Sequence, residues 1–273
     1  MNRLPALHGI SWLAQGFALM RAQPGRLLFL AVLLQLVLGL ARVPLVSFFV
    51  IIAMPALSAG LLQAFRMIAA GQRPASTVLF APLAAGAKTG RLLMLGALMV
   101  VVGIVSVSLL LSGSQSTLDP ELLVRIEQGD TQALAELDPA LLLRMFSSIA
   151  VGISLSGTLS FMAIPLLWFH DWKLGAALTS GIRALFVNWR PFTVLGLGLA
   201  ALLVPVALAV AVLFQTAGTG GVFSLLLVGL MVLVALAFQL LIFGAQYCSF
   251  RDIYGLDAPP AGAGSGADDQ LLA

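Results

Sequence analysis

Apolar runs long enough to cross a membrane dominate the chain. Three stretches contain no Asp, Glu, Lys or Arg at all: 92–118, 145–170 and 191–250. About 20 apolar residues, each adding 1.5 Å, are needed to cross ~30 Å of hydrocarbon. The pattern therefore predicts an all-α, polytopic transmembrane helix bundle that forms a single domain over residues 1–257. Its six spans are expected at about 27–46, 47–67, 92–111, 145–168, 191–214 and 222–248.

The first two predicted spans are separated by very few polar residues. Arg42 and Pro44 interrupt the apolar pattern, and we expect a tight hairpin turn near Ser47. In that arrangement the Arg42 side chain reaches toward the nearer membrane surface. The alternative is a re-entrant hairpin, which enters and leaves the membrane on the same side.

Composition supports a membrane protein and excludes several other classes. The 273 residues are 60% hydrophobic and 9% charged, whereas soluble domains carry about 25% charged residues. The pI near 9.6 does not indicate a nucleic-acid partner, because the basic residues flank apolar spans and form no basic soluble face. The single cysteine, Cys248, excludes an internal disulfide or a multi-cysteine metal site.

The placement of Lys and Arg in short loops predicts the orientation. With the N-terminus inside, the cytoplasmic side of a bacterial inner membrane receives 11 of the 14 basic residues. These are Arg3, Arg21, Arg26, Arg66, Arg73, Lys88, Arg91, Lys173, Arg183, Arg190 and Arg251. The other three are Arg42, Arg125 and Arg144. Both termini are then cytoplasmic.

An acidic loop at 112–144 is expected on the periplasmic side. Its carboxylates are Asp119, Glu121, Glu127, Asp130, Glu136 and Asp138. Two short amphipathic helices are predicted. The Asp119-Pro120 step starts the first, with an N-cap before a proline at the first helical position, and Gly129 ends it before Asp130 caps the second. The carboxylates lack the spacing of a calcium loop, which favours a solvated surface. The Gly- and Pro-rich segment 258–273 is expected to be a disordered cytoplasmic tail.

Two amphipathic segments are expected to lie in the inner leaflet. The stretch "HGISWLAQGFALMRAQPGR" carries Ile10, Leu13, Phe17 and Met20 on one side, and residues 174–187 have a similar character. The basic segment 66–91 adds attraction to anionic lipids at the cytoplasmic face. Four tryptophans are predicted interfacial anchors: Trp12, Trp168, Trp172 and Trp189.

Segments 8–73 and 175–257 share an order of features that indicates parallel internal repeats. Each amphipathic segment contains a glycine (Gly16, Gly181) and leads through an amide residue to a proline that opens a span. Each unit closes with Phe-Arg, an isoleucine and a final glycine (Gly71, Gly255). Spans three and four would be inserted between the two units. Parallel repeats of this kind occur in transporters.

The fourth span carries small residues at every fourth position: Ser148, Gly152, Ser156 and Ser160. Such a stripe lets helices approach closely, so a packing seam is the first interpretation. A polar permeation path along the same serines is the alternative.

The segment "WFHDWK" places His170 beside Asp171, but adjacent helical residues point about 100° apart. We expect an interfacial anchor in which Asp171 caps the following helix. A lipid-modifying enzyme would need His170 and Asp171 as an acid–base pair. Motifs for a P-loop, a zinc protease or a serine hydrolase are missing, so no enzyme, cofactor or metal is predicted. Arg42 is a further weak functional candidate.

Four segments resemble an uncharacterised family of proteobacterial inner-membrane proteins with about six spans. They are "MPALSAGLLQAFRMIAAGQRP", "IPLLWFHDW", "NWRPF" and "DIYG". The resemblance implies a polytopic inner-membrane protein without an assigned reaction, and it supplies no catalytic residue.

Function is predicted largely by elimination. The leading hypothesis is a non-enzymatic transport component or envelope-associated factor that forms a homo-oligomer, or binds another membrane protein, through its small-residue faces. The alternative is a structural or regulatory membrane module that binds a protein partner.

Overall fold

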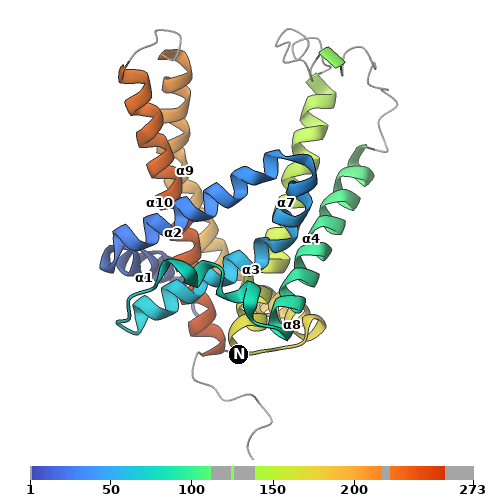
Figure 1. Ribbon diagram of the computed structural model, residues 1–273, viewed down its shortest axis with the longest axis vertical. Helices are drawn as coiled ribbons and strands as arrows, with labels where there is room; N and C mark the ends of the chain where they lie inside the picture. The colour runs from blue at the N-terminus through green and yellow to red at the C-terminus, as the bar shows by residue number, and fades with distance from the viewer. Residues whose placement is uncertain (1, 112–123, 126–138, 217–221, 256–273) are drawn as a thin grey trace, which may run out of the picture.

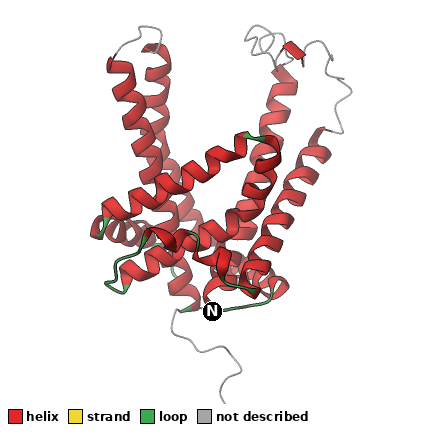
Figure 2. Ribbon diagram, in the orientation of Figure 1, coloured by secondary structure: helices red, strands yellow, loops and turns green. Residues whose placement is uncertain are grey.

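The computed structural model describes residues 2–111, 124–125, 139–216 and 222–255. Over these ranges the regular elements are helices, without a strand (Figure 2). Six of the helices are long and apolar enough to cross a membrane. The predicted all-α polytopic fold is confirmed, whereas the acidic segment 112–138 and the tail 258–273 lie almost entirely outside the described residues.

The long helices are α2 (Pro24–Gly39), α3 (Pro44–Ala69), α4 (Ala87–Leu111), α7 (Pro139–Phe169), α9 (Trp189–Thr216) and α10 (Val222–Tyr254). The shorter elements are α1 (His8–Ala22), α8 (Leu174–Val187) and three 3-10 turns, η1 (Leu40–Arg42), η2 (Ser76–Leu79) and η3 (Ala81–Ala84). Prolines stand in the first turn of α2 and α3, where the missing backbone N–H costs nothing.

Two helix pairs give the bundle its shape. Helix α4 packs along α7 and α9 lies beside α10; the pairs diverge toward one end of the molecule (Figure 1). We call this the far end, and the opposite end, where α3, α7 and α10 finish and α4 and α9 begin, the basic end. The hydrophobic core is concentrated toward the basic end, where Trp12, Leu92, Leu167 and Phe250 are fully buried.

Helix α3 is the central element of that core. All residues from Pro55 to Leu62 are buried, as are Ala64 and Phe65, and α3 contacts α4, α7, α10 and the η2 and η3 turns. This part of α3 contains Ala56, Ala59 and Gly60, whose small size lets neighbouring backbone approach closely. The segment after α3 folds back as 3-10 turns against it, with Gly60 in contact with the backbone of Leu79.

The α2–α3 hairpin differs from the predicted one. The turn lies at Arg42 and Val43, not near Ser47, because Pro44 starts α3 and Val43 before it is extended. Along the long axis of the molecule the turn lies level with the end of α4, whereas α7, α9 and α10 continue further (Figure 1). Both helices qualify as membrane spans by length and composition, and the spanning and re-entrant forms of the hairpin both stay predictions.

The two proposed repeat units share local features but not their dimensions. Gly16 of α1 lies against Gly244 of α10, and Gly181 of α8 lies against Met162 of α7, so both aligned glycines permit close packing. Gly71 and Gly255 both have a positive φ, of 72° and 76°. However, α2 and α3 contain 16 and 26 residues, whereas α9 and α10 contain 28 and 33. The repeat stays a prediction.

The crossing of α3 and α4 depends on Gly96. A Cβ at this position would lie 2.0 Å from the carbonyl oxygen of Ile52. We therefore predict that Gly96→Ala separates the two helices and destabilises the protein by about 1–3 kcal/mol. Thermal unfolding in mild detergent measures the effect.

Gly103→Ala, on the same helix, is the control. A Cβ there meets nothing within 4 Å, so the substitution should be neutral or mildly stabilising. Equal melting temperatures for the two variants would contradict the close crossing.

Candidate functional site

Charge is concentrated at the basic end. The eleven Lys and Arg residues that we assign to the cytoplasmic side lie in α1, α8, the helix termini and the connecting segments around this end, or in the first turn of α2. Only two described carboxylates, Asp171 and Asp252, accompany them. Within the described chain the basic end therefore carries a large positive excess.

Asp171 forms the turn between α7 and α8. Its φ is 56°, in the left-handed region. Arg91 of α4 donates hydrogen bonds to the carbonyls of Asp171 (2.7 Å) and Trp172 (2.9 Å) and pairs with the Asp171 carboxylate at 3.0 Å. Lys88 donates to the carbonyl of Trp168 (3.2 Å). The start of α4 thus holds the end of α7. The N-cap of α8 is Lys173, without a side-chain cap bond, so the expectation that Asp171 caps α8 is wrong.

His170 points to a different neighbour. Its Nε2 lies 3.0 Å from the carbonyl oxygen of Gly255, and its ring packs edge-on against Phe250 (centroids 5.3 Å apart) and Tyr254 (6.4 Å). Asp171 faces α4, whereas His170 faces α10. The structure does not bring this pair together as an acid and a base acting on one substrate.

A polar network joins α1 to the end of α10. Trp12 donates from Nε1 to Asp252 Oδ2 at 2.9 Å. Arg251 donates from Nε to Asp252 Oδ1 at 3.1 Å and also donates to Gln15 of α1. The Trp12 ring is fully buried and packs on Phe192 of α9, with 5.2 Å between ring centroids. Trp12 therefore anchors α1 to its protein neighbours and does not face lipid.

The other predicted anchors have different surroundings. Trp168 donates to Gln63 Oε1 at 3.2 Å, and Lys88 lies over its ring. Trp172 packs against His170 and Tyr254. Trp189 is 58% exposed, with Arg190 beside its ring. Of the four tryptophans, Trp189 has the surface exposure that a membrane-interface ring needs.

The small-residue stripe of α7 is packed against α4. Ser148, Gly152, Ser156 and Ser160 are all buried. A Cβ at Gly152 would lie 3.5 Å from Ser106 and 3.7 Å from Gly103, both on α4. Ser160 donates to the carbonyl of Gly157 in its own helix at 3.1 Å. This geometry is that of a packing seam.

Arg42 lies exposed at the turn of the α2–α3 hairpin. The two described carboxylates lie at the basic end and pair with Arg91 and Arg251. Among the described residues, no group of three or more His, Cys, Asp or Glu could hold a metal ion.

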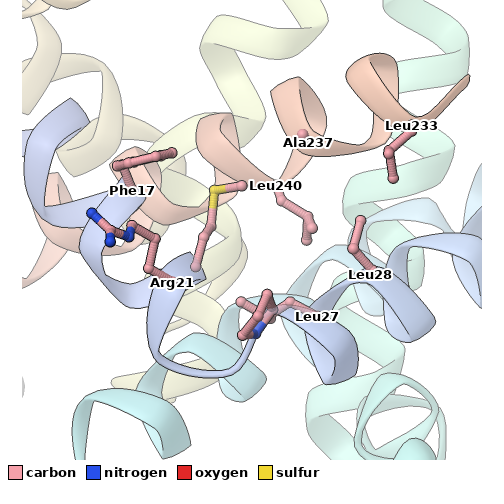
Figure 3. Close-up of a pocket in the computed structure, with 9 residues that line it drawn as sticks. Phe17, Arg21, Leu27, Leu28, Leu233, Ala237 and Leu240 are labelled. Carbon is pink, nitrogen blue, oxygen red and sulfur yellow. The ribbon is translucent and has the colours of Figure 1, made fainter. Parts of the chain in front are cut away.

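A cavity of about 250 Å³ lies between α1, α2 and α10 (Figure 3). Its lining surface is apolar, and Arg21 borders it with the aliphatic part of its side chain. The lining residues are Phe17, Met20, Arg21, Pro24, Leu27, Leu28, Leu233, Ala237 and Leu240. Arg21 lies on the α1 side of the cavity, with its guanidinium carbon 5.9 Å from the centre of the Phe17 ring.

Gln23 forms the corner between α1 and α2 beside this cavity. Its Nε2 donates to the carbonyl of Gln72 at 3.0 Å. Its Oε1 is buried and accepts no hydrogen bond from the described residues. Arg21, the unsatisfied Oε1 atom of Gln23 and the apolar cavity therefore lie near one another at this corner.

Sequence reasoning found only part of this cavity. Phe17 and Met20 were identifiable from the apolar stripe of the first amphipathic segment. Leu233, Ala237 and Leu240 lie within a uniformly apolar helix, where no pattern distinguishes a cavity wall from a lipid-facing side.

The fold defines the protein as an α-helical, multi-pass integral membrane protein. Comparison of the chain with protein-family profiles, with curated proteins and with solved structures gives no match. The resemblance noted from four sequence segments accordingly stays a prediction.

Different substitutions of Asp171, whose φ lies in the left-handed region, should destabilise the protein to different extents. Asp171→Gly should leave stability almost unchanged, because glycine adopts this φ without strain, which offsets the loss of the exposed ion pair with Arg91. Asp171→Val should destabilise by roughly 1–2 kcal/mol, since a β-branched residue is strained there.

Asp171→Asn separates conformation from charge. It keeps a residue that tolerates the left-handed region but removes the ion pair with Arg91, which is exposed and worth at most about 1 kcal/mol. Melting temperatures in detergent should fall in the order Gly, Asn, Val. A Gly variant as unstable as the Val variant would show that the side chain matters more than the turn.

Proposed function

We propose that this protein is a non-enzymatic component of a lipid-handling transport or envelope system. It binds a phospholipid with an acyl chain in the cavity between α1, α2 and α10 and with the phosphate at Arg21. The observation that carries the proposal is the apolar cavity, which Arg21 borders with its aliphatic stem while its guanidinium lies beside the Phe17 ring.

The chemistry of the cavity supports a phospholipid as ligand. Acyl chains gain little from an apolar wall alone, because the surrounding lipid is equally apolar. Selectivity must therefore come from the headgroup. A guanidinium binds phosphate in a bidentate manner and is weakly hydrated, and the described residues accept no hydrogen bond from Arg21. The positive excess of the basic end favours anionic lipids.

The structure of the bundle also favours an apolar molecule over an ion as the transported ligand. Among the described residues, every charged side chain of the six long helices lies within two turns of a helix end, whereas ion-coupled transporters use buried acids, histidines or arginines at mid-depth. The diverging helix pairs expose large apolar side chains, including Ile104 on α4, Ile153 on α7 and Leu230 on α10. These surfaces suit lipid contact.

We further propose that the protein lies in a bacterial inner membrane with both termini in the cytoplasm. In this orientation Arg21 faces the leaflet that carries anionic lipid at the cytoplasmic surface. The alternative role, binding a protein partner through the acidic segment, concerns residues outside the described ranges and stays a prediction, as does self-association.

Filling the cavity should displace the lipid. We predict that Ala237→Phe, which places a ring in the cavity, lowers the amount of phosphatidylglycerol that remains bound after purification in mild detergent. Native mass spectrometry counts the bound lipids. Ala235→Phe, two residues away on the exposed side of the same helix, is the matched control and should retain the lipid.

Removing the cation should weaken the same complex. Arg21→Gln is expected to lower affinity for phosphatidylglycerol about tenfold, because a hydrogen bond to a charged group contributes roughly 1.5–3 kcal/mol. Phosphatidylcholine should be affected similarly if the phosphate is the contact. Unchanged lipid binding in both Ala237→Phe and Arg21→Gln would disprove the site.

Orientation is tested separately. A reporter that is active only in the cytoplasm, fused after Ala273, should be active. The same reporter inserted at residue 130 should be inactive, because we place the acidic segment in the periplasm. The reverse pattern would exclude the proposed orientation.

A further inference from the structure

Gln35 of α2 and Gln239 of α10 form a hydrogen-bonded amide pair on the outside of the bundle, where α2 passes across α10 (Figure 1). Gln35 Nε2 donates to Gln239 Oε1 at 2.9 Å. Gln35 is exposed and Gln239 is half-buried. We propose that this amide pair is the centre of a contact surface for a second copy of the same chain. The proposal does not rest on the lipid cavity, because it concerns other side chains and another partner.

The length of α10 places the amide pair within the hydrocarbon layer. Helix α10 runs from Val222 to Tyr254. Gln239 lies 17 residues after the start and 15 residues before the end, which correspond to about 25 Å and about 22 Å of helix. Neither part alone can cross ~30 Å of hydrocarbon. Wherever α10 crosses the layer, Gln239 is therefore inside it, and Gln35, which is bonded to Gln239, lies at the same depth.

At this depth the two amides keep hydrogen-bonding groups that lipid tails cannot satisfy. A glutamine amide has two N–H donors and a carbonyl that can accept two hydrogen bonds. Within the described chain, the pair uses one N–H of Gln35 and one acceptor position of Gln239. The Gln35 carbonyl and the Gln239 amino group stay available, among exposed apolar side chains such as Val32 and Leu36. Polar groups in hydrocarbon are costly to leave unpaired, so a protein partner is favoured.

A second copy of the chain satisfies both groups at once. Copies inserted with the same topology carry their amide pairs at the same depth. When a two-fold axis along the membrane normal relates them, the Gln239 amino group of each copy can donate to the Gln35 carbonyl of the other. The amides then form a closed ring of hydrogen bonds, both within and between the copies. An unrelated membrane protein would need a matching polar group at this depth, whereas a second copy always has one.

Small residues beside the amide pair allow a second copy to approach closely. Gly39 lies one turn after Gln35 on the same side of α2. It is exposed, and a Cβ there would meet nothing within 4 Å. Ala235 lies one turn before Gln239 on the same side of α10 and is also exposed. Small residues and interhelical hydrogen bonds together are typical of helix contacts in membranes. This surface therefore differs from the small-residue stripe of α7, which packs against α4.

Energy transfer between labelled chains in a bilayer tests the association. Donor and acceptor dyes are attached at Ser265→Cys in a Cys248→Ser background, and the full chain is diluted with phosphatidylethanolamine and phosphatidylglycerol in vesicles. The labelled chain with both glutamines should be dimeric. Gln35→Leu and Gln239→Leu together should raise the dissociation constant about tenfold or more, because two hydrogen bonds between the copies are lost.

A second variant leaves both amides in place. Ala235→Phe adds a ring to the contact surface, so it should prevent dimers by steric exclusion. Ile153→Phe is the matched control, because it adds a ring to an exposed position of α7, and its dissociation constant should not change. The melting temperature of each variant in detergent shows that the chain is folded.

Failure of this proposal and failure of the lipid site give different results. Ala235→Phe should lose the dimer and keep phosphatidylglycerol, whereas Ala237→Phe should lose the lipid and keep the dimer. The proposal is overturned if the chain with both glutamines stays monomeric at the highest chain-to-lipid ratio. A dimer that persists both in the double glutamine variant and in Ala235→Phe would also overturn it. So would stoichiometric capture of another membrane protein by a monomeric chain, since the surface would then belong to that partner.

Discussion

Close backbone contact at glycine is the interaction on which this bundle depends. Hydrocarbon gives apolar helices no hydrophobic reason to associate, so packing must supply the attraction. Gly16 meets Gly244, Gly60 meets Leu79 and Gly96 meets Ile52, each closely enough that a Cβ would collide with backbone. These contacts join α1 to α10, η2 to α3 and α3 to α4. The four glycines are buried, and the helix pairs separate beyond them (Figure 1).

Polar contacts complete the basic end and fix which helix ends meet. Arg91 binds the α7–α8 turn, and the Asp252 carboxylate accepts a hydrogen bond from Trp12 and pairs with Arg251. Charged hydrogen bonds are directional and fix how the helix ends are oriented. The glycine contacts only allow the helices to approach each other closely. Together they give a rigid base from which two helix pairs diverge. The cavity between α1, α2 and α10 borders this base.

The sequence was sufficient for the helical class, for the six apolar helices and for the gathering of positive charge, because these follow from the lengths of runs and from rare residues. It was insufficient within uniformly apolar helices, because no polar residue there marks which side faces protein and which side faces lipid. The turn expected near Ser47 lies inside α3, because Pro44 favours a first helical turn and starts the helix three residues earlier. The burial of Trp12 depends on Asp252, far along the chain. The cavity walls on α10 are leucine and alanine in a helix that is apolar on all sides.

The bond between Trp12 and Asp252 also bears on how the chain is assembled. The two residues are 240 positions apart, and translation at 5–20 residues per second separates them by roughly 12–48 s. During that interval α1 lacks α9 and α10, its main neighbours, while every intervening helix is inserted. An amphipathic helix can wait on the membrane surface, so the first helix to be made is among the last to be docked.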